Sequence, residues 1–153
     1  RRASGDDVFL VQSIGLNNPA AIKFVKHNDA TVLTEGPASF TEFWNQRLRW
    51  AGKNAEFANT KHKSVLGGVW LYNLLILVLL LVAKPVTLTC AGFLVLLKVL
   101  SEDKFYRALD KDLNLGLYFK TLLLGQPFHI VYMALMPIAS QIFKYHWKER
   151  LYK

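Results

Sequence analysis

The distribution of hydrophobic and polar residues divides the chain at about residue 65. Residues 66–83 carry no charged side chain and are long enough to cross a hydrocarbon core about 30 Å thick. A turn at Lys84-Pro85 follows, and residues 86–100 then form a second, shorter apolar run. The pattern predicts two transmembrane helices within 66–100, the second returning across the membrane.

The chain after residue 100 has a more mixed pattern. Residues 101–114 combine charges of both signs with apolar residues at helical spacing, which predicts an amphipathic connector on the membrane surface. Residues 115–143 are too many for one straight crossing and few for two, and prolines interrupt them. We expect a broken membrane-embedded helical segment there, either a re-entrant pair or a surface helix followed by a tilted span. The basic tail over 144–153 is expected on the cytoplasmic side.

Residues 1–65 have the pattern of a soluble α/β domain. Residues 7–14 are predicted to be helical, and 22–26 and 30–33 are predicted to be short β-rich segments separated by turns. So few strands would bury only a small core. We therefore expect an α/β remnant, the carboxy-terminal part of a larger domain, followed by an α-helical transmembrane region.

Composition and charge place the chain at a lipid bilayer. Its 153 residues are 52% hydrophobic, with a net charge of +8. So basic a chain raises nucleic acid as a partner. Basic residues, however, lie just before the first apolar run and after the last, where cytoplasmic membrane anchors belong; they are Lys53, Lys61 and Lys63, and Lys144, Lys148, Arg150 and Lys153. We expect a bilayer and no nucleic acid as partner.

Cysteine and histidine exclude several kinds of site. Cys90 is the only cysteine, so neither an intrachain disulfide nor a cysteine-based metal cluster can form. The histidines are far apart in sequence and differ in context, so no metal site is predicted within this chain; they are His27, His62, His129 and His146.

A polar and aromatic motif precedes the first apolar run. Ser39 and Glu42 form a capping box that predicts a helix over about 40–53, lying at the membrane interface. On it Gln46, Arg49 and Trp50 share one face, where an amide, a fixed cation and an aromatic ring suit hydroxyls, phosphate and a sugar ring. An ordinary surface helix whose aromatic residues belong to a core is the alternative.

Two carboxylates, Asp6 and Asp7, begin the first predicted helix. Helix starts favour acids, and Ser4 with Asp7 is itself a capping box, so a structural role is the simpler interpretation of the local pattern. A carboxylate base, an arginine and a stacking tryptophan are also the parts needed to move a sugar from a nucleotide donor to a hydroxyl.

The order of these motifs resembles the carboxy-terminal half of family 2 membrane glycosyltransferases, which include cellulose, hyaluronan and poly-N-acetylglucosamine synthases. The resemblance rests on Ser4-Gly5-Asp6-Asp7, Thr34-Glu35-Gly36-Pro37 and the Gln-x-x-Arg-Trp run Gln46-Arg47-Leu48-Arg49-Trp50, with membrane spans after them. It covers residues 4 to about 100. It implies a GT-A-like catalytic domain on the cytoplasmic side of the cell membrane.

The resemblance also implies the chemistry. Asp7 would be the catalytic base supported by Asp6, and Gln46, Arg49 and Trp50 would bind substrate. Arg47 points about 100° from Gln46 and would either add to that site or meet lipid head groups. The partners would be a nucleotide-sugar donor and a carbohydrate or lipid acceptor.

A divalent metal, Mg²⁺ or Mn²⁺, is expected in the full-length enzyme, with ligands outside this chain, because the Asp-x-Asp of the family is missing here. Asp110-Lys111-Asp112 matches those letters but follows both spans and is assigned to the connector. The isolated fragment is expected to be inactive. The alternatives are a membrane transporter, a scaffold, or a non-catalytic subunit of the same family.

Overall fold

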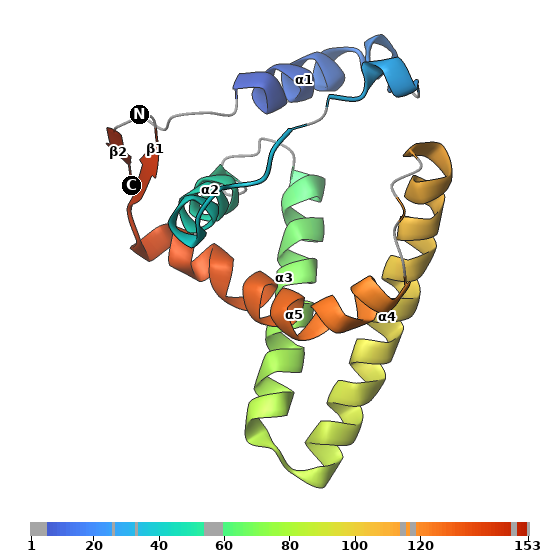
Figure 1. The fold of residues 1–153 in the computed structure, drawn as a ribbon, viewed down its shortest axis with the longest axis vertical. Helices are drawn as coiled ribbons and strands as arrows, with labels where there is room; N and C mark the ends of the chain where they lie inside the picture. Colours follow the sequence, from blue (N-terminus) through green and yellow to red (C-terminus); the bar gives the residue numbers. More distant parts are fainter. Residues whose placement is uncertain are drawn as a thin grey trace. The chain divides into compact units, whose positions relative to one another are not determined.

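A computed structural model of the chain describes residues 6–25, 27–32, 34–53, 60–113, 116, 119–147 and 150–152. The described part is mainly helical, with one small sheet (Figure 1). It divides into two units, one of Arg1–Gly67 with Met136–Lys153 and the other of Gly68–Leu135. An α/β arrangement is therefore not seen in the described residues.

Two α-helices and a hairpin make up most of the first unit. Helix α1 spans Asp6–Asn17 and α2 spans Phe40–Lys53, while strands β1 (Tyr145–Trp147) and β2 (Arg150–Tyr152) form an antiparallel pair. The tail expected over 144–153 is thus partly a β-hairpin. Strand β1 packs on α2.

The predicted β-rich segments are wrong within the described residues. Two short 3₁₀ helices, η1 (Pro19–Ala21) and η2 (Asn28–Ala30), lie in this region, and its other described residues form no strand. A strand needs a neighbour to pair its backbone polar groups, and the β-prone side chains here are exposed, Phe24 to 76% and Val32 to 82%. Lys26 and Leu33, the ends of the two predicted segments, lie outside the described residues.

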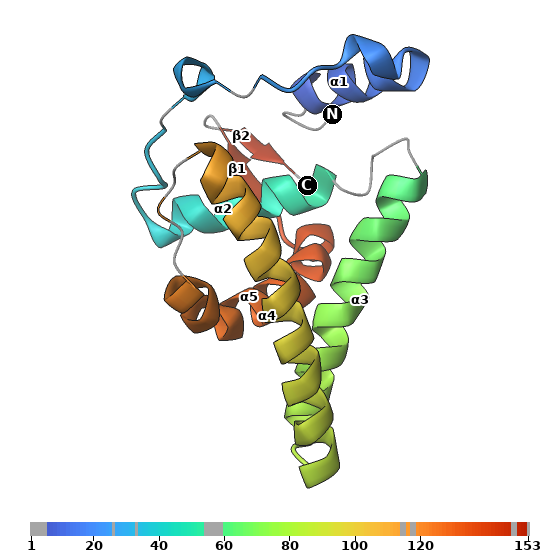
Figure 2. The same ribbon diagram turned by 90° about the vertical axis from the view of Figure 1, so that its right-hand side faces the viewer.

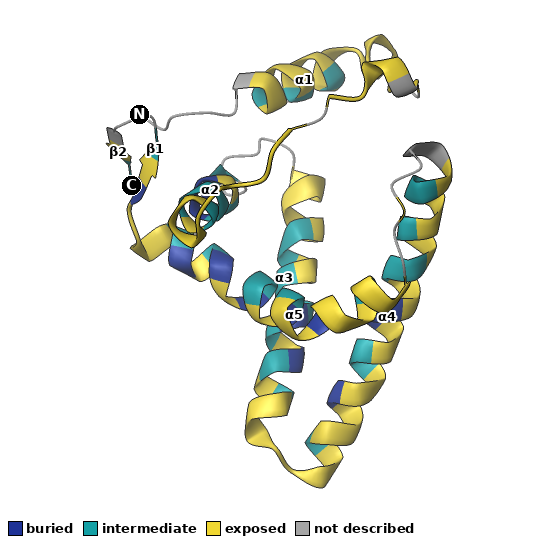
Figure 3. Ribbon diagram, viewed as in Figure 1, coloured by how far each residue is buried: buried dark blue, intermediate teal, exposed yellow. Residues whose placement is uncertain are grey.

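Three long helices follow. Helix α3 spans Thr60–Val82, α4 spans Pro85–Leu113 and α5 spans Phe119–Ile142. Each contains a window apolar enough to cross a membrane, and most of their surface is exposed (Figure 3). Apolar side chains that no protein covers are expected to face lipid. The chain is therefore a membrane-embedded protein.

The second unit is built from α3, α4 and the first part of α5. The Tyr72 hydroxyl donates to the Leu94 carbonyl at 2.7 Å, which ties α3 to α4, and the Trp70 indole donates to the Ala134 carbonyl at 3.0 Å, which ties α3 to α5. This part of α5 lies crosswise to α3 and α4 (Figures 1 and 2). Ile76, Ala91 and Ala134 are fully buried.

Helix α4 joins what the sequence pattern divides into a span and a connector. It runs through Ser101 without a break. The Ser101 hydroxyl donates to the Leu97 carbonyl, and ion pairs at spacing i, i+4 join Lys98 to Glu102 and Arg107 to Asp103, each at 2.7 Å. These local contacts support a helix across the junction.

Helix α5 is likewise continuous where a broken segment is predicted. Pro127 and Pro137 both lie inside it. A proline removes one intrahelical hydrogen bond, but tertiary packing can offset that cost. Ile130 and Ala134 are buried just after Pro127, and the Ser140 hydroxyl donates to the carbonyl of Pro137. Packing therefore outweighs the two helix breakers.

Candidate functional site

Helix α2 presents the Gln-x-x-Arg-Trp motif from a capped start. The Glu42 backbone N–H donates to Ser39 Oγ at 3.2 Å, and the Ala38 N–H donates to Glu42 Oε2 at 2.9 Å. These bonds satisfy backbone donors at the helix start, as in a capping box. The first turn is therefore fixed, and the motif lies on the two turns that follow.

Arg49 is buried against the carboxy-terminal hairpin. Only 9% of Arg49 is exposed, and its guanidinium carbon lies 3.9 Å from the centre of the Trp147 ring. Burial lowers the pKa of Arg49, and electrostatic interactions with Tyr145 and Asp7 offset part of that lowering. The pKa of an arginine is normally far above neutral pH, so Arg49 remains charged.

Arg47 takes a different environment. Its guanidinium carbon lies 4.6 Å from the centre of the Trp50 ring and 4.9 Å from that of Phe43. Phe43, Arg47 and Trp50 occupy positions i, i+4 and i+7, which form one stripe of a helix. Trp50 is 43% exposed. The motif thus has two sides, Arg47 with Trp50 on one and Arg49 with the hairpin on the other.

The structure brings Asp7 and Arg49 into electrostatic range. Asp7 lies exposed in the first turn of α1, and its negative charge offsets part of the lowering of the Arg49 pKa by burial. Asp6 is the first residue of α1, and its side chain is outside the described part. The upstream carboxylate and the motif cation therefore share one region of the first unit. Gln46 is half-buried on α2.

The hairpin supplies site residues that the sequence pattern does not reveal. The His146 backbone N–H donates to Asn45 Oδ1 at 3.0 Å, Tyr145 is 5% exposed, and Trp147 covers Arg49. The Tyr145 and Tyr152 rings stack across the two strands at 5.7 Å. The sequence does contain a signal for this strand, because Tyr145 and Trp147 alternate with His146, the spacing of a strand with one packed face. The lysines around them, however, suggest a charged tail.

Other residues weighed for chemistry lie elsewhere. His27 pairs locally with Asp29 at 3.5 Å, and His129 belongs to the second unit. Asp110 and Lys111 are part of α4, and Cys90 is exposed on the same helix. Among the described residues, no three His, Cys, Asp or Glu side chains gather where they could hold a metal ion.

The chain matches no protein-family model, no curated protein and no solved structure. The case for a function consequently depends on the residues of the first unit and their geometry.

Proposed function

We propose that the chain supplies the general base and the acceptor-binding motif of a membrane-bound inverting glycosyltransferase. The observation that carries this proposal is the electrostatic interaction between the Asp7 carboxylate and the Arg49 guanidinium, which lie far apart in sequence. A base and a phosphate-binding cation in one region, on a helix that also carries an exposed tryptophan, are the parts that sugar transfer needs. The apolar helices that follow would hold this site at a membrane, with its catalytic face in the cytoplasm.

The reaction would be a single in-line displacement. The acceptor hydroxyl oxygen forms a bond to the anomeric carbon of the donor sugar, and the bond from that carbon to the diphosphate oxygen breaks. The leaving nucleoside diphosphate keeps the electron pair, and the Asp7 carboxylate takes the hydroxyl proton. Asp7 suits this role because it lies exposed at a helix start, where substrate can reach it.

Arg49 would act on the leaving group. Negative charge grows on the diphosphate during the reaction, so a fixed cation stabilises the transition state more than the ground state. The hairpin shields Arg49 from water. A lower local dielectric constant strengthens the attraction between a cation and phosphate oxygens. Its fork of N–H donors also matches phosphate geometry.

Trp50 and Gln46 would hold the acceptor. An exposed indole can stack on the apolar face of a sugar ring, and an amide can both donate to and accept from hydroxyl groups. Arg47 lies on the Trp50 ring, so it would orient the indole while one ring face remains available to a sugar. Donor recognition, including any Mg²⁺ or Mn²⁺, is assigned to chain outside these 153 residues.

The test is sugar transfer by the full-length protein in membranes. Transfer is measured as the release of nucleoside diphosphate from each of a panel of nucleotide-sugars. Loss of a general base typically costs 10²–10⁴-fold in rate, so Asp7→Asn is expected to lower turnover at least about 100-fold. Asp29→Asn is the matched control, because Asp29 is an exposed acid of the same unit and pairs with its neighbour His27.

Trp50→Ala separates binding from chemistry. It is expected to raise the acceptor KM more than it lowers kcat, because the ring contacts sugar in both ground and transition states. Normal turnover by Asp7→Asn would overturn the base assignment. Sugar-independent solute flux through reconstituted wild-type protein, without transfer from any donor, would instead favour a transporter.

A further inference from the structure

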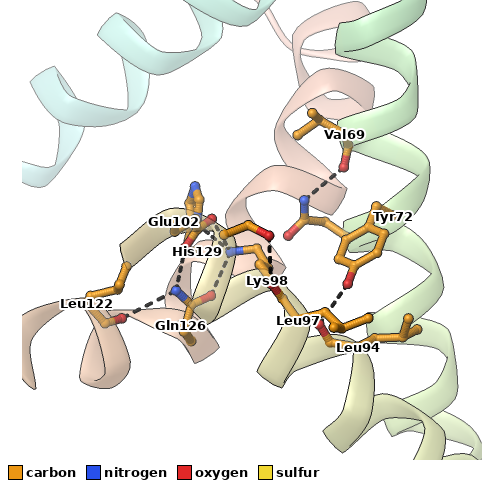
Figure 4. Close-up of polar contacts among 11 residues, drawn as sticks. Val69, Tyr72, Leu94, Leu97, Lys98, Glu102, Leu122, Gln126 and His129 are labelled. Atoms are coloured by element: carbon orange, nitrogen blue, oxygen red, sulfur yellow. Dashed lines mark hydrogen bonds and ion pairs between the residues drawn. The ribbon is translucent and has the colours of Figure 1, made fainter. Parts of the chain in front are cut away.

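A polar cluster ties α5 to α4 within the second unit (Figure 4). The Lys98 ammonium lies 2.7 Å from Glu102 Oε1, 2.6 Å from Gln126 Oε1 and 2.9 Å from His129 Nδ1. The Gln126 amide donates to the other Glu102 oxygen at 2.6 Å. Lys98 is 7% exposed and Gln126 is 3% exposed. All four residues thus belong to one connected network.

This network sets a fixed floor beneath a cavity. A cavity of about 480 Å³ lies between the second half of α4 and the first half of α5, and both Gln126 and His129 line it. Because Gln126 bonds to Lys98 and Glu102 as well as to its own helix, its side chain cannot rotate without breaking several contacts. The cavity is therefore preformed on that side.

The walls are two facing helical stripes. From α4 come positions at i, i+3, i+4 and i+7, namely Asp103, Tyr106, Arg107 and Asp110. Phe119 and Leu122 add apolar lining from α5. Such a periodic set places all these side chains on the surfaces that face one another.

The charges in the wall have both signs. Asp103 and Asp110 are carboxylates and Arg107 is a cation, and the Arg107 Nε lies 2.7 Å from an Asp103 oxygen. A net negative wall disfavours an anionic ligand. A zwitterion suits it, because Arg107 and Asp110 are three residues apart and so offer a cation and an anion on one face of α4.

The cavity also adjoins apolar surface on α5. Phe119, which lines the cavity, is 45% exposed, and Leu123, one turn further along α5, is 49% exposed on nearly the same side of the helix. Exposed apolar side chains on a membrane helix are expected to contact acyl chains. A ligand with a charged head and an apolar tail would satisfy both regions.

We propose that this cavity binds the zwitterionic head group of a phospholipid, with the phosphate at Arg107 and the ammonium at Asp110. The ring of Tyr106 adds a cation–π surface for the ammonium. The acyl chains would run along the exposed side chains of Phe119 and Leu123 on α5. This site lies wholly in the second unit and does not depend on the chemistry proposed for the first.

The test is native mass spectrometry of the purified full-length protein with equal amounts of phosphatidylethanolamine and phosphatidylglycerol. Wild type is expected to retain phosphatidylethanolamine roughly tenfold better, the value of one charged hydrogen bond. Asp110→Asn is expected to abolish the preference and Asp110→Glu to keep it, while Arg107→Gln weakens retention of both lipids. Lys104→Gln, an exposed α4 residue outside the cavity lining, is the matched control and should behave as wild type.

Three results would overturn the proposal. Equal or greater retention of phosphatidylglycerol by wild type would indicate an anionic ligand or unspecific lipid. An unchanged preference in Asp110→Asn would remove Asp110 from the site. Loss of preference in Lys104→Gln would show a general charge effect of α4 and no defined cavity. Thermal unfolding of each variant in detergent verifies that it is folded. If Asp110→Asn does not fold, Asp110→Glu still tests the site, because it keeps the carboxylate and should keep the preference for phosphatidylethanolamine.

Discussion

The contact between Trp147 and Arg49 predicts how far the hairpin protects the motif cation. Trp147→Ala removes the ring that lies 3.9 Å from the guanidinium. A cation–π contact is worth about 0.5–1 kcal/mol when exposed and about 2 kcal/mol when desolvated. Arg49 is only 9% exposed, so the higher value applies, which corresponds to roughly a 30-fold change in the equilibrium between covered and uncovered Arg49.

The assay is modification of arginine by phenylglyoxal, followed by peptide-resolved mass spectrometry of the segment that holds Arg49. If reaction requires an uncovered guanidinium, Trp147→Ala should raise the modification rate of Arg49 roughly 30-fold. Trp147→Phe keeps an aromatic ring and should raise the rate less. The reaction of Arg107, which lies in the other unit and is 73% exposed in its side chain, provides an internal reference within each sample.

Leu151→Ala is the matched control for the hairpin. Leu151 lies on β2 and is 55% exposed, so its truncation removes surface from the same element without touching Arg49. An Arg49 rate in Trp147→Ala within about twofold of wild type would refute the protective role of the ring, since 2 kcal/mol predicts far more. An equal rise in Leu151→Ala would mean that the hairpin opens as a whole, whatever residue is changed.

Two further changes probe the second unit by thermal unfolding in detergent. Lys98→Met should lower the unfolding free energy by about 3–5 kcal/mol, because it leaves Glu102 half-buried without its cation. The double change Lys98→Met with Glu102→Gln should recover part of this loss, and the control Lys111→Met, on the exposed surface of α4, should be neutral. A Lys98→Met variant as stable as wild type would contradict a stabilising role of the network. Ala83→Gly should stabilise by about 1 kcal/mol, because Ala83 has φ 55°, a conformation that costs non-glycine residues about that amount; a lower unfolding temperature would refute this.

The helices were the predictable part of the fold. The capping box at Ser39 and Glu42 lies at the start of α2, and the uncharged run over 66–83 lies almost entirely within α3. Their signals are local, set by hydrogen bonds or composition within a few turns. Element ends were harder, because the ion pairs that carry α4 past Ser101 and the packing that carries α5 past Pro127 depend on particular side chains.

The site was predictable in its residues but not in its arrangement. Helical spacing alone places Gln46, Arg49 and Trp50 on one face. It cannot show that the guanidinium of Arg49 packs on Trp147, far along the chain, while Trp50 packs on Arg47. The β-rich expectation for 22–26 failed for a related reason, since β-propensity describes a side chain on a paired surface, and no strand lies beside these residues in the described structure.

The packing of β1 on α2 also limits the path of the chain through a membrane. Because the two elements are in contact, the chain leaves α2 and arrives at β1 on the same side of any bilayer that the intervening helices enter. A path that begins and ends on one side crosses an even number of times. Three complete crossings by α3, α4 and α5 are therefore impossible, although each helix is long and apolar enough for one.

Helices α3 and α4, joined by the short turn at Ala83, would form a pair of opposite crossings. The odd helix is then α5, whose first part lies crosswise to both (Figure 1). If α3 and α4 cross in opposite directions, an even number of crossings requires that α5 enter and leave the bilayer by the same face. In that arrangement α5 would lie along the membrane although it has the composition of a span, which agrees with the contact between β1 and α2.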